Sequence, residues 1–356
     1  MSCLHVSSSL SYSKLARIVT NIIGYERGNL GMATLKDVAK EAGLTVTTVS
    51  RVLNNRGYIS EDARNRVSEA MKKLNYRPNE VARSLHNKKT NTIGLIVPHI
   101  RHPYFAEMIS NIENEAYKKG YKILLCNSQS TKERVSEYID ICTSNRVAGI
   151  ILCSGVVSVS TFEDLDVPVI TMERYLDEGT ASVECDNEAG GRLAAQTLID
   201  AGCKKLLFIG GPVGSHMPAD KRRDGFKSVC DETGVEIVEA ETESLSYVDI
   251  TYSEFLEKVF IEHPDIDGLF ASSDVIAAQA LQVCRKIGIS VPDQLKIVGF
   301  DDVIIATVTT PQLTTIHQPV KEMARKAIEL LHDAANGKEV DKQVVLPVSL
   351  VKRETV

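Results

Sequence analysis

The chain has 356 residues, of which 43% are hydrophobic and 25% are charged, and its formal net charge is −6. That length allows two or three domains with sizeable cores, and the composition is typical of a soluble globular protein. No apolar run approaches the ~18 residues that a membrane-spanning helix needs, so a membrane partner is not expected.

The charge is unevenly distributed along the sequence. Residues 1–31 contain 3 Lys and Arg against 1 Asp and Glu, residues 32–90 contain 12 against 6, and residues 91–356 contain 26 against 40. The three segments therefore carry +2, +6 and −14, which sum to −6. A small basic segment on a large acidic body indicates that only the small segment meets a polyanion. The plainer interpretation, a solvated surface, remains open on charge alone.

The sequence contains no recognisable metal, cofactor or catalytic motif. None of its 8 cysteines forms a C-x-x-C pair, so reduced thiols are expected. His99 and His102 lie three residues apart, but Pro103 follows and no acidic or Cys partner is near in sequence. GGPVG at 210–214 is not a dinucleotide fingerprint, and neither a P-loop nor G-x-S-x-G occurs. We therefore predict no metal, no cofactor and no enzymatic activity.

Residues 1–31 precede the first motif. They lack the long apolar core and the small-residue cleavage site of a signal peptide. Their Ser-rich composition permits a disordered arm. Alternatively, the codons of Arg27 and Gly28 could be a ribosome-binding site ahead of Met32, so that translation begins at Met32.

Residues 34–74 predict three short helices. The first covers 35–42, with Thr34 as its N-cap and Gly43 ending it in a left-handed conformation. The second covers about 46–53 with Thr45 as its cap, and the third covers 60–74 with Ser60 as its cap. Two helices joined by a tight glycine turn are a helix-turn-helix arrangement, the DNA-binding motif.

The second helix has a composition that suits the major groove. Its β-branched residues lower helix propensity, yet Val49, Val52 and Leu53 have the spacing of an inward-facing helical stripe. Small Val and Thr side chains on the outer face can touch thymine methyls, and Arg51 can bind guanine through two hydrogen bonds. An ordinary three-helix domain would carry Glu and Lys on this face, and none occurs between Glu41 and Glu61.

The stretches TLKDVAKEAGLTVTTVSRVLN and LNYRPNEVARSL resemble the DNA-binding headpiece and hinge of the lactose/purine repressor family of bacterial regulators, and the resemblance extends over about 320 residues to the end of the chain. It implies double-stranded operator DNA as a partner. It also places two sets of residues on the DNA: base-reading positions at Val46, Thr47 and Arg51, and backbone-contacting positions at Thr45, Thr48, Ser50 and Asn54. The family usually begins at a residue like Met32, which leaves 1–31 as an extension.

Residues 79–90 are predicted to be a hinge helix and linker, since Pro78 starts a new segment. So short a helix is marginal alone in water. The resemblance implies that the hinges of two subunits form against each other in the minor groove, where Leu85 is wedged between base pairs next to Asn79, Ala82 and Arg83. A passive linker is the alternative, and it would leave Leu85 needlessly exposed.

After residue 90, apolar strand-like runs alternate with helical stretches, which predicts parallel sheets covered by helices on both faces. The runs are TIGLIVP, YKILLCN, VAGIILC, VPVITM, KKLLFIGG, DGLFASS and LKIVGFD, and the helical stretches are 104–119, 132–145, 188–201, 222–233 and 275–287. The family resemblance implies a periplasmic-binding-protein-like body of two subdomains. Subdomain one would comprise 91–184 and 319–345, and subdomain two 186–316, within an effector-binding and dimerisation domain at 91–356.

Ligands of such sheets bind beyond the carboxyl ends of the strands. The residues predicted there are Tyr104, Phe105, Glu173, Arg222, Tyr247, Ser273 and Asp301. Aromatic rings beside Arg and Asp suit a carbohydrate, and the resemblance assigns Arg222 and Asp301 to the effector. The family's frequent asparagine is replaced by Ser273. Alternatively, Asp301 caps the following segment and Arg222 forms a surface ion pair.

The sequence thus predicts an all-α helix-turn-helix headpiece at 32–78 and an α/β body of two parallel-sheet subdomains. The function that follows is a cytoplasmic, nucleoid-associated homodimeric regulator, most simply a repressor of a carbohydrate-use operon. A sugar or sugar phosphate would control its DNA binding, either releasing or promoting it. HPYFAEM, KILLCNS and GCKKLLFIGG most resemble repressors of sucrose or fructose genes. The alternative is a solute-binding protein of a transport system, which the head and the missing export signal disfavour.

Overall fold

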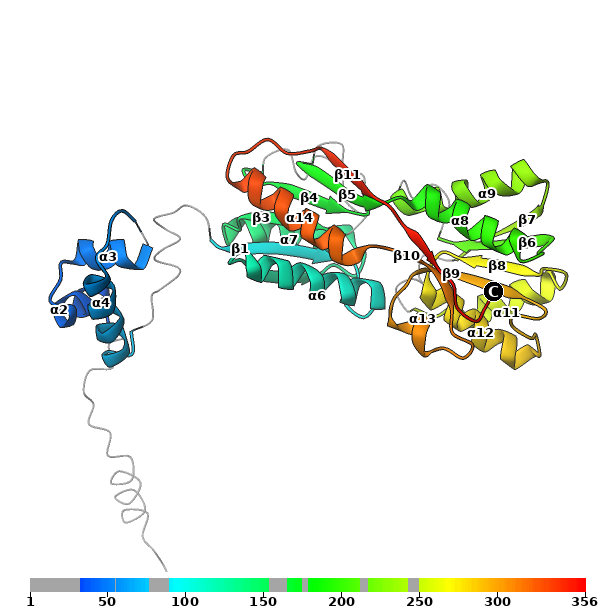
Figure 1. The fold of residues 1–356 in the computed structure, drawn as a ribbon, viewed down its shortest axis with the longest axis horizontal. Coiled ribbons are helices and arrows are strands. Elements are labelled where there is room, and N and C mark those ends of the chain that lie inside the picture. The colour runs from blue at the N-terminus through cyan, green and yellow to red at the C-terminus, as the bar shows by residue number, and fades with distance from the viewer. Residues whose placement is uncertain are drawn as a thin grey trace, which may run out of the picture. The chain divides into compact units, whose positions relative to one another are not determined.

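The computed structural model describes residues 33–54, 56–76, 90–153, 165–174, 179–211, 217–242 and 250–356. The predictions for 1–31, for the hinge residues Asn79, Ala82, Arg83 and Leu85, and for Tyr247 lie outside these residues. The chain divides into two compact units, Met1–His86 and Asn87–Val356, which we call the head and the body (Figure 1). No described helix is long and apolar enough to cross a membrane.

The head contains the three predicted helices, α2 (Leu35–Ala42), α3 (Val46–Asn54) and α4 (Glu61–Lys73). The caps are confirmed. The Thr34 hydroxyl accepts from the Asp37 N–H while the Asp37 carboxylate accepts from the Thr34 N–H, which satisfies two donors at once. Gly43 has φ 62°, as expected for a helix-ending glycine. The third helix is one residue shorter at each end than predicted, because Ser60 and Leu74 are its caps.

A small core holds the three helices of the head together. It contains the buried residues Val38, Ala39, Ala42, Val49, Val67 and Ala70, with Val52 and Leu53 packed against them. Arg66 of α4 donates from Nη2 to the carbonyls of Ala42 and Gly43, at 2.7 and 3.1 Å. These bonds occupy carbonyls that the end of α2 leaves without helical partners, and so fix the turn between α2 and α3.

The body has two six-stranded sheets, which confirms the predicted α/β class. The first has the order β11-β5-β4-β3-β1-β2 and is parallel throughout. Its strands are β1 (Thr92–Val97), β2 (Lys122–Asn127), β3 (Gly149–Leu152), β4 (Val169–Met172), β5 (Ala181–Cys185) and β11 (Gln343–Leu346). Helices α6 (Pro103–Lys118), α7 (Lys132–Ser144) and α14 (Val320–Ala335) pack against it (Figure 1).

The second sheet has the order β12-β10-β9-β8-β6-β7, in which only β12 runs antiparallel to its neighbour. Its strands are β6 (Lys205–Gly210), β7 (Glu236–Glu241), β8 (Gly268–Ala271), β9 (Lys296–Asp301), β10 (Thr314–His317) and β12 (Ser349–Val351). Its helices are α8 (Asn187–Asp200), α9 (Lys221–Thr233), α11 (Ser253–Glu262), α12 (Asp274–Ile287) and α13 (Ile304–Val308), with a 3₁₀ turn, η2 (Pro218–Asp220).

The chain passes between the two sheets at three places. It leaves the first sheet after β5 and returns after β10, near the two predicted crossings, and it leaves again between β11 and β12. The third passage was not predicted. The chain from Ser349 onward therefore belongs to the second sheet. There the Thr355 hydroxyl donates to the Ile297 carbonyl at 2.6 Å and accepts from the Thr314 N–H at 2.9 Å.

Candidate functional site

The outer face of α3 is the candidate DNA-reading surface of the head. Thr45, Val46, Thr47 and Arg51 are exposed, and Val46 keeps 40% of its surface accessible although it is apolar. Val49, on the same helix, is fully buried in the head core. The helix thus has the two faces that the sequence predicted, one packed inward and one available to a partner.

Two predicted backbone-contacting residues are partly engaged within the head. The Thr45 hydroxyl accepts from the Thr48 N–H at 3.1 Å, which makes Thr45 the cap of α3, and lies 2.8 Å from the Thr48 hydroxyl. Thr48 and Ser50 are half-buried, and Asn54 ends the helix. A capped N-terminus with hydroxyls around it is suited to a phosphate oxygen, because backbone N–H groups and the helix dipole point toward it.

In the body, six polar side chains from separate elements meet at one place. We call this set the buried cluster: Tyr104, Glu173, Asn187, Arg222, Asp301 and Gln318. All six have less than 9% of their surface exposed. They come from the starts of α6, α8 and α9 and from the ends of β4, β9 and β10, so the carboxyl ends of strands from both sheets contribute.

Arg222 is the centre of the buried cluster. Its Nε donates to Asn187 Oδ1 at 2.7 Å and its Nη1 to the Ser272 carbonyl at 2.8 Å. The guanidinium lies 3.9 Å from both Glu173 Oε2 and Asp301 Oδ1. It stacks on the Phe300 ring with 3.7 Å between Cζ and the ring centroid. Five neighbours therefore fix one buried cation, which excludes the alternative of a surface ion pair.

The two carboxylates are held by different partners. Glu173 accepts from the Cys185 N–H at 2.6 Å and from Asn187 Nδ2 at 2.9 Å. Asp301 accepts from Gln318 Nε2 at 2.6 Å, and burial raises its pKa to about 7 although Arg222 opposes that shift. Both residues have positive φ, 52° and 116°, a conformation that costs free energy and is concentrated at functional sites. The alternative role of Asp301 as a cap is not observed, since Val303 precedes α13.

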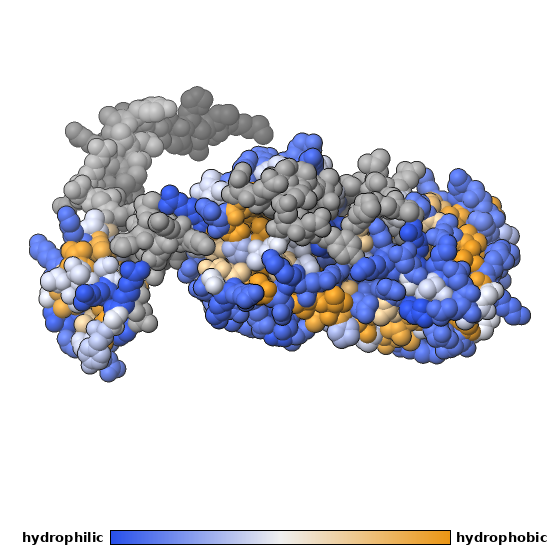
Figure 2. All heavy atoms as spheres, turned by 90° about the horizontal axis from the view of Figure 1, so that it is seen from above, coloured by the Kyte–Doolittle hydropathy of each residue, from blue (hydrophilic) through white to orange (hydrophobic). Residues whose placement is uncertain are grey.

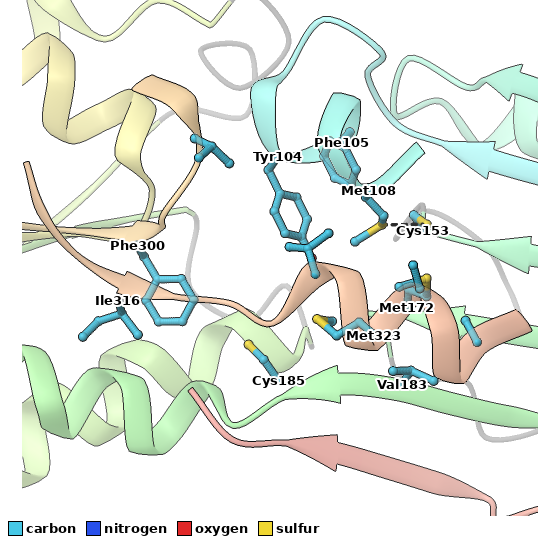
Figure 3. Close-up of a cluster of buried hydrophobic side chains, with 14 of the residues drawn as sticks. Tyr104, Phe105, Met108, Cys153, Met172, Val183, Cys185, Phe300, Ile316 and Met323 are labelled. Carbon is cyan, nitrogen blue, oxygen red and sulfur yellow. Dashed lines mark hydrogen bonds between the residues drawn. The ribbon is translucent and has the colours of Figure 1, made fainter. Parts of the chain in front are cut away.

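Two buried polar atoms of the cluster have no hydrogen-bond partner: the Tyr104 hydroxyl and Gln318 Oε1. Leaving such an atom unpaired costs roughly 1–3 kcal/mol. Figure 3 shows Tyr104 extending from the first turn of α6 into the space between the two halves of the body, toward Phe300 and Cys185. One donor and one acceptor without partners, beside two carboxylates and a guanidinium, point to a polar ligand at this position.

Two residues predicted to contact the ligand, Phe105 and Ser273, do not belong to the buried cluster. Phe105 packs into the apolar core beside Met108, with its ring centroid 5.2 Å from that of Tyr104 (Figure 3). Ser273 accepts from the Ile276 N–H and so caps α12. Asp274, which follows Ser273, is fully buried and accepts from the Thr315 hydroxyl and the Val303 N–H.

The sequence analysis missed Asn187 and Gln318. Asn187 joins Glu173 to Arg222, and Gln318 joins Asp301 to the crossing segment. Gln318 directly follows β10 and Asn187 lies two residues after β5. Their position after a strand is the signal that could have identified them.

The closeness of α8 and α9 determines where Asn187 and Arg222 stand. A Cβ at Gly191 would lie 2.0 Å from the Arg222 carbonyl oxygen, and a Cβ at Gly225 would lie 2.1 Å from the Glu188 carbonyl oxygen. Only glycine allows two helix backbones to approach so closely. The two helices therefore carry their site residues as one unit.

Comparison with known proteins covers both units. Residues 34–79 match the bacterial regulatory proteins of the lacI family, and residues 178–356 match a periplasmic binding protein-like domain. The chain is 38% identical over 326 residues to a ribose operon repressor of Halalkalibacterium halodurans, covering 91% of this chain and 97% of the relative. It is 37% identical over 325 residues to a sucrose operon repressor of Streptococcus mutans, covering 91% of this chain and 100% of the relative.

Two solved structures extend the comparison. The lac repressor dimer bound to operator and an anti-inducer has a TM-score of 0.81 and 25% identity, covering 91% of this chain and 98% of that chain. A periplasmic binding protein/LacI transcriptional regulator from Alkaliphilus metalliredigens, complexed with D-xylulofuranose, has a TM-score of 0.68 and 32% identity. It covers 75% of this chain and 99% of that chain.

Proposed function

Since the chain belongs to the lacI family of bacterial regulatory proteins, and is a DNA-binding transcriptional regulator rather than an enzyme, we propose that it represses a carbohydrate-utilisation operon under the control of a sugar. The single observation that carries the sugar part is the buried cluster, with its unpaired Tyr104 hydroxyl and Gln318 Oε1 between two carboxylates and Arg222. Hydroxyl groups of a sugar can donate to the carboxylates and accept from Tyr104 and Arg222.

On the DNA side, we assign base reading to Val46, Thr47 and Arg51, whose side chains are exposed on one face of α3. Backbone contacts are assigned to Thr45, Thr48, Ser50 and Asn54. The hinge residues Asn79, Ala82, Arg83 and Leu85 would complete the interface in the minor groove. Replacing Leu85 by alanine is then expected to reduce both operator affinity and operator bending.

A homodimer is the proposed working form, acting on chromosomal DNA in the cytoplasm. Two apolar residues of the short helix α13, Ile304 and Val308, are 68% and 69% exposed. Figure 2 shows orange patches among the hydrophilic surface of the body. Exposed apolar area of this kind is typical of a protein interface. A dimer would also present two heads, and so would require an operator with two related half-sites.

The effector and the DNA would be coupled by linkage. A ligand that binds one arrangement of the two subdomains better than another changes the population of the arrangement that binds DNA. We assign the ligand contacts to Tyr104, Glu173, Arg222, Tyr247 and Asp301, and add Asn187 and Gln318. Phe105 and Ser273 are left out, because Phe105 packs in the core and Ser273 caps α12. Asp301 and Arg222 would supply the charge-assisted hydrogen bonds, each contributing about 1.5–3 kcal/mol.

The test is binding of the full-length protein to labelled DNA from upstream of its own operon, compared with shuffled DNA, between 50 and 200 mM salt, a range over which phosphate contacts weaken steeply. A regulator is expected to bind the upstream DNA more tightly than the shuffled DNA, and its DNA affinity is expected to change when a sugar is added. A transport-type solute-binding protein, the second candidate, shows no sequence preference at any salt concentration.

A variant pair tests the sugar site. Arg222→Ala is expected to weaken sugar binding at least tenfold, which corresponds to ~1.4 kcal/mol, with unchanged ligand-free operator affinity. Arg223→Ala is the matched control, because Arg223 pairs with Glu239 at 3.8 Å outside the cluster. Wild-type sugar affinity in Arg222→Ala would contradict the assignment. Loss of folding and DNA binding together would indicate a structural role only.

A further inference from the structure

The charges around the buried cluster discriminate between two classes of sugar. Resting on the proposed function, we infer that the effector is an uncharged polyhydroxyl sugar and that its phosphorylated forms are rejected. Three features of the chain support this inference: the state of its buried cations, the excess of acceptors over donors, and the carboxylate at the start of α8.

The first feature is that the buried cation of the cluster, Arg222, is already engaged. Among the described Lys and Arg residues of the body, only Arg174 and Arg222 are buried. Arg222 already stands between Glu173 and Asp301, with Nε and Nη1 donating to other partners. Arg174 donates from Nε to the Cys153 carbonyl at 3.2 Å. A phosphate dianion in this interior would need a cation of its own, because an unpaired buried charge is costly.

The second feature is that acceptors exceed donors. Both Glu173 oxygens and one Asp301 oxygen already accept hydrogen bonds, and Gln318 presents an unpaired acceptor, Oε1. An ionised phosphate offers only acceptors, so it cannot satisfy Gln318 and would lie beside carboxylates. A sugar hydroxyl both donates and accepts, so one diol can satisfy Gln318 Oε1 and the Tyr104 hydroxyl together.

The third feature is the start of α8, where a carboxylate already occupies a backbone donor. A helix N-terminus attracts phosphate through its free N–H groups. Here the Asp186 carboxylate accepts from the Ala189 N–H at 3.0 Å. Helix α6 begins at Pro103, which has no N–H to donate, so this helix has one free donor fewer. Asp186 thus stands where a phosphate-binding protein would leave a donor open.

The experiment is isothermal titration calorimetry of the full-length protein at pH 8 with matched pairs. The probes are D-ribose, D-xylulose, D-fructose and sucrose, each against its monophosphates at the available positions. The expected result is that at least one unphosphorylated sugar binds and that each of its phosphates binds at least 100-fold more weakly. Equal or tighter binding of a phosphate overturns the inference, and so does the failure of every unphosphorylated sugar.

Variants localise the effect. Tyr104→Phe removes only the unpaired hydroxyl and is expected to weaken the bound sugar about tenfold. The matched control, Tyr121→Phe, removes a hydroxyl that bonds His332 Nδ1 at 3.0 Å elsewhere in the body and should leave affinity unchanged. If a phosphate binds and Arg174→Gln abolishes that binding, the inference fails while the proposed function stands. Failure of the proposed function itself would appear separately, as loss of sequence preference on DNA.

Discussion

The outer face of α3 and the buried cluster place their polar side chains in opposite surroundings. Arg51 is exposed, whereas Arg222 touches five groups and keeps 7% of its surface accessible. An exposed residue such as Arg51 can be replaced with little change in the free energy of unfolding, because water already hydrogen-bonds to its side chain. A buried residue such as Arg222 is part of the interior, so its replacement affects stability and binding together. The outer face of α3 is thus available for DNA recognition alone, whereas the buried cluster also stabilises the fold of the body.

The largest effect is expected for the pH dependence of body stability. Burial raises the Asp301 pKa to about 7 from 3.8, so the folded body binds a proton that the unfolded chain has already lost above pH 3.8. Stability therefore falls as pH rises from about 4 to about 7, by up to about 4 kcal/mol at 1.36 kcal/mol per pH unit. Asp301→Asn should flatten this slope and make the ligand-free body more stable at pH 8.

Thermal and urea unfolding at several pH values measure this slope. Asp231→Asn, at an exposed carboxyl of α9, is the control and should keep the wild-type profile. If Asp301→Asn keeps the wild-type slope of unfolding free energy against pH, protonation of Asp301 does not contribute to the stability of the body.

A smaller loss should follow from the close approach of α8 and α9. Gly191→Ala puts a methyl group 2.0 Å from the Arg222 carbonyl oxygen, so the helices must separate, at a cost of about 1–3 kcal/mol or more. The melting temperature of the body is expected to fall. Sugar affinity is expected to weaken as well, because Asn187 and Arg222 shift. Gly211→Ala, where an added Cβ meets nothing within 4 Å, should melt like wild type. Equal melting of both variants would refute the rigid-pair description.

A substitution on the outer face of α3 should change operator binding without changing stability. Arg51→Ala is expected to cost about 1–3 kcal/mol of operator binding, mainly at one base position, with no change in melting. Anisotropy titrations against operators with single-base changes measure the effect. A uniform loss at every position would instead assign Arg51 to the phosphate backbone.

The smallest effect tests the head's own stability. Thr34→Ala removes the side chain that caps α2 and breaks its reciprocal bond with Asp37, at a cost of about 1 kcal/mol. Circular dichroism melting should show a lower head transition and an unchanged body transition. A shift of the body transition would mean that the two units do not unfold independently.

Much of the fold followed from local sequence signals. Helix α2 was predictable at both ends because Thr34 and Gly43 impose their own backbone conformations, and seven strands were predictable as continuous apolar runs. Strands β5, β7, β10, β11 and β12 were not among these runs. Of these, β7, β11 and β12 are half-exposed, with burial that varies along the strand. In these strands pairing with a distant partner, not composition, decides the conformation.

The buried cluster was only partly predictable for a similar reason. Arg222 and Asp301 were found through a family resemblance and their position after strands. Asn187 directly follows Asp186, so it reads as part of a helix start, and only the fold reveals that its amide joins Glu173 to Arg222. Phe105 stands beside Tyr104 in sequence, but successive residues of a helix point about 100° apart, so one enters the core while the other faces the site.

The third passage between the sheets has a consequence for synthesis on the ribosome. The chain supplies β12 and Thr355 to the second sheet after almost everything else has been made, and Thr355 bonds two strands of that sheet. The head, whose apolar core lies within residues 35–76, can take its shape early in translation. The body cannot close its second half until residues 349–355 emerge. A nascent chain therefore has a folded head before it has the part that responds to a sugar.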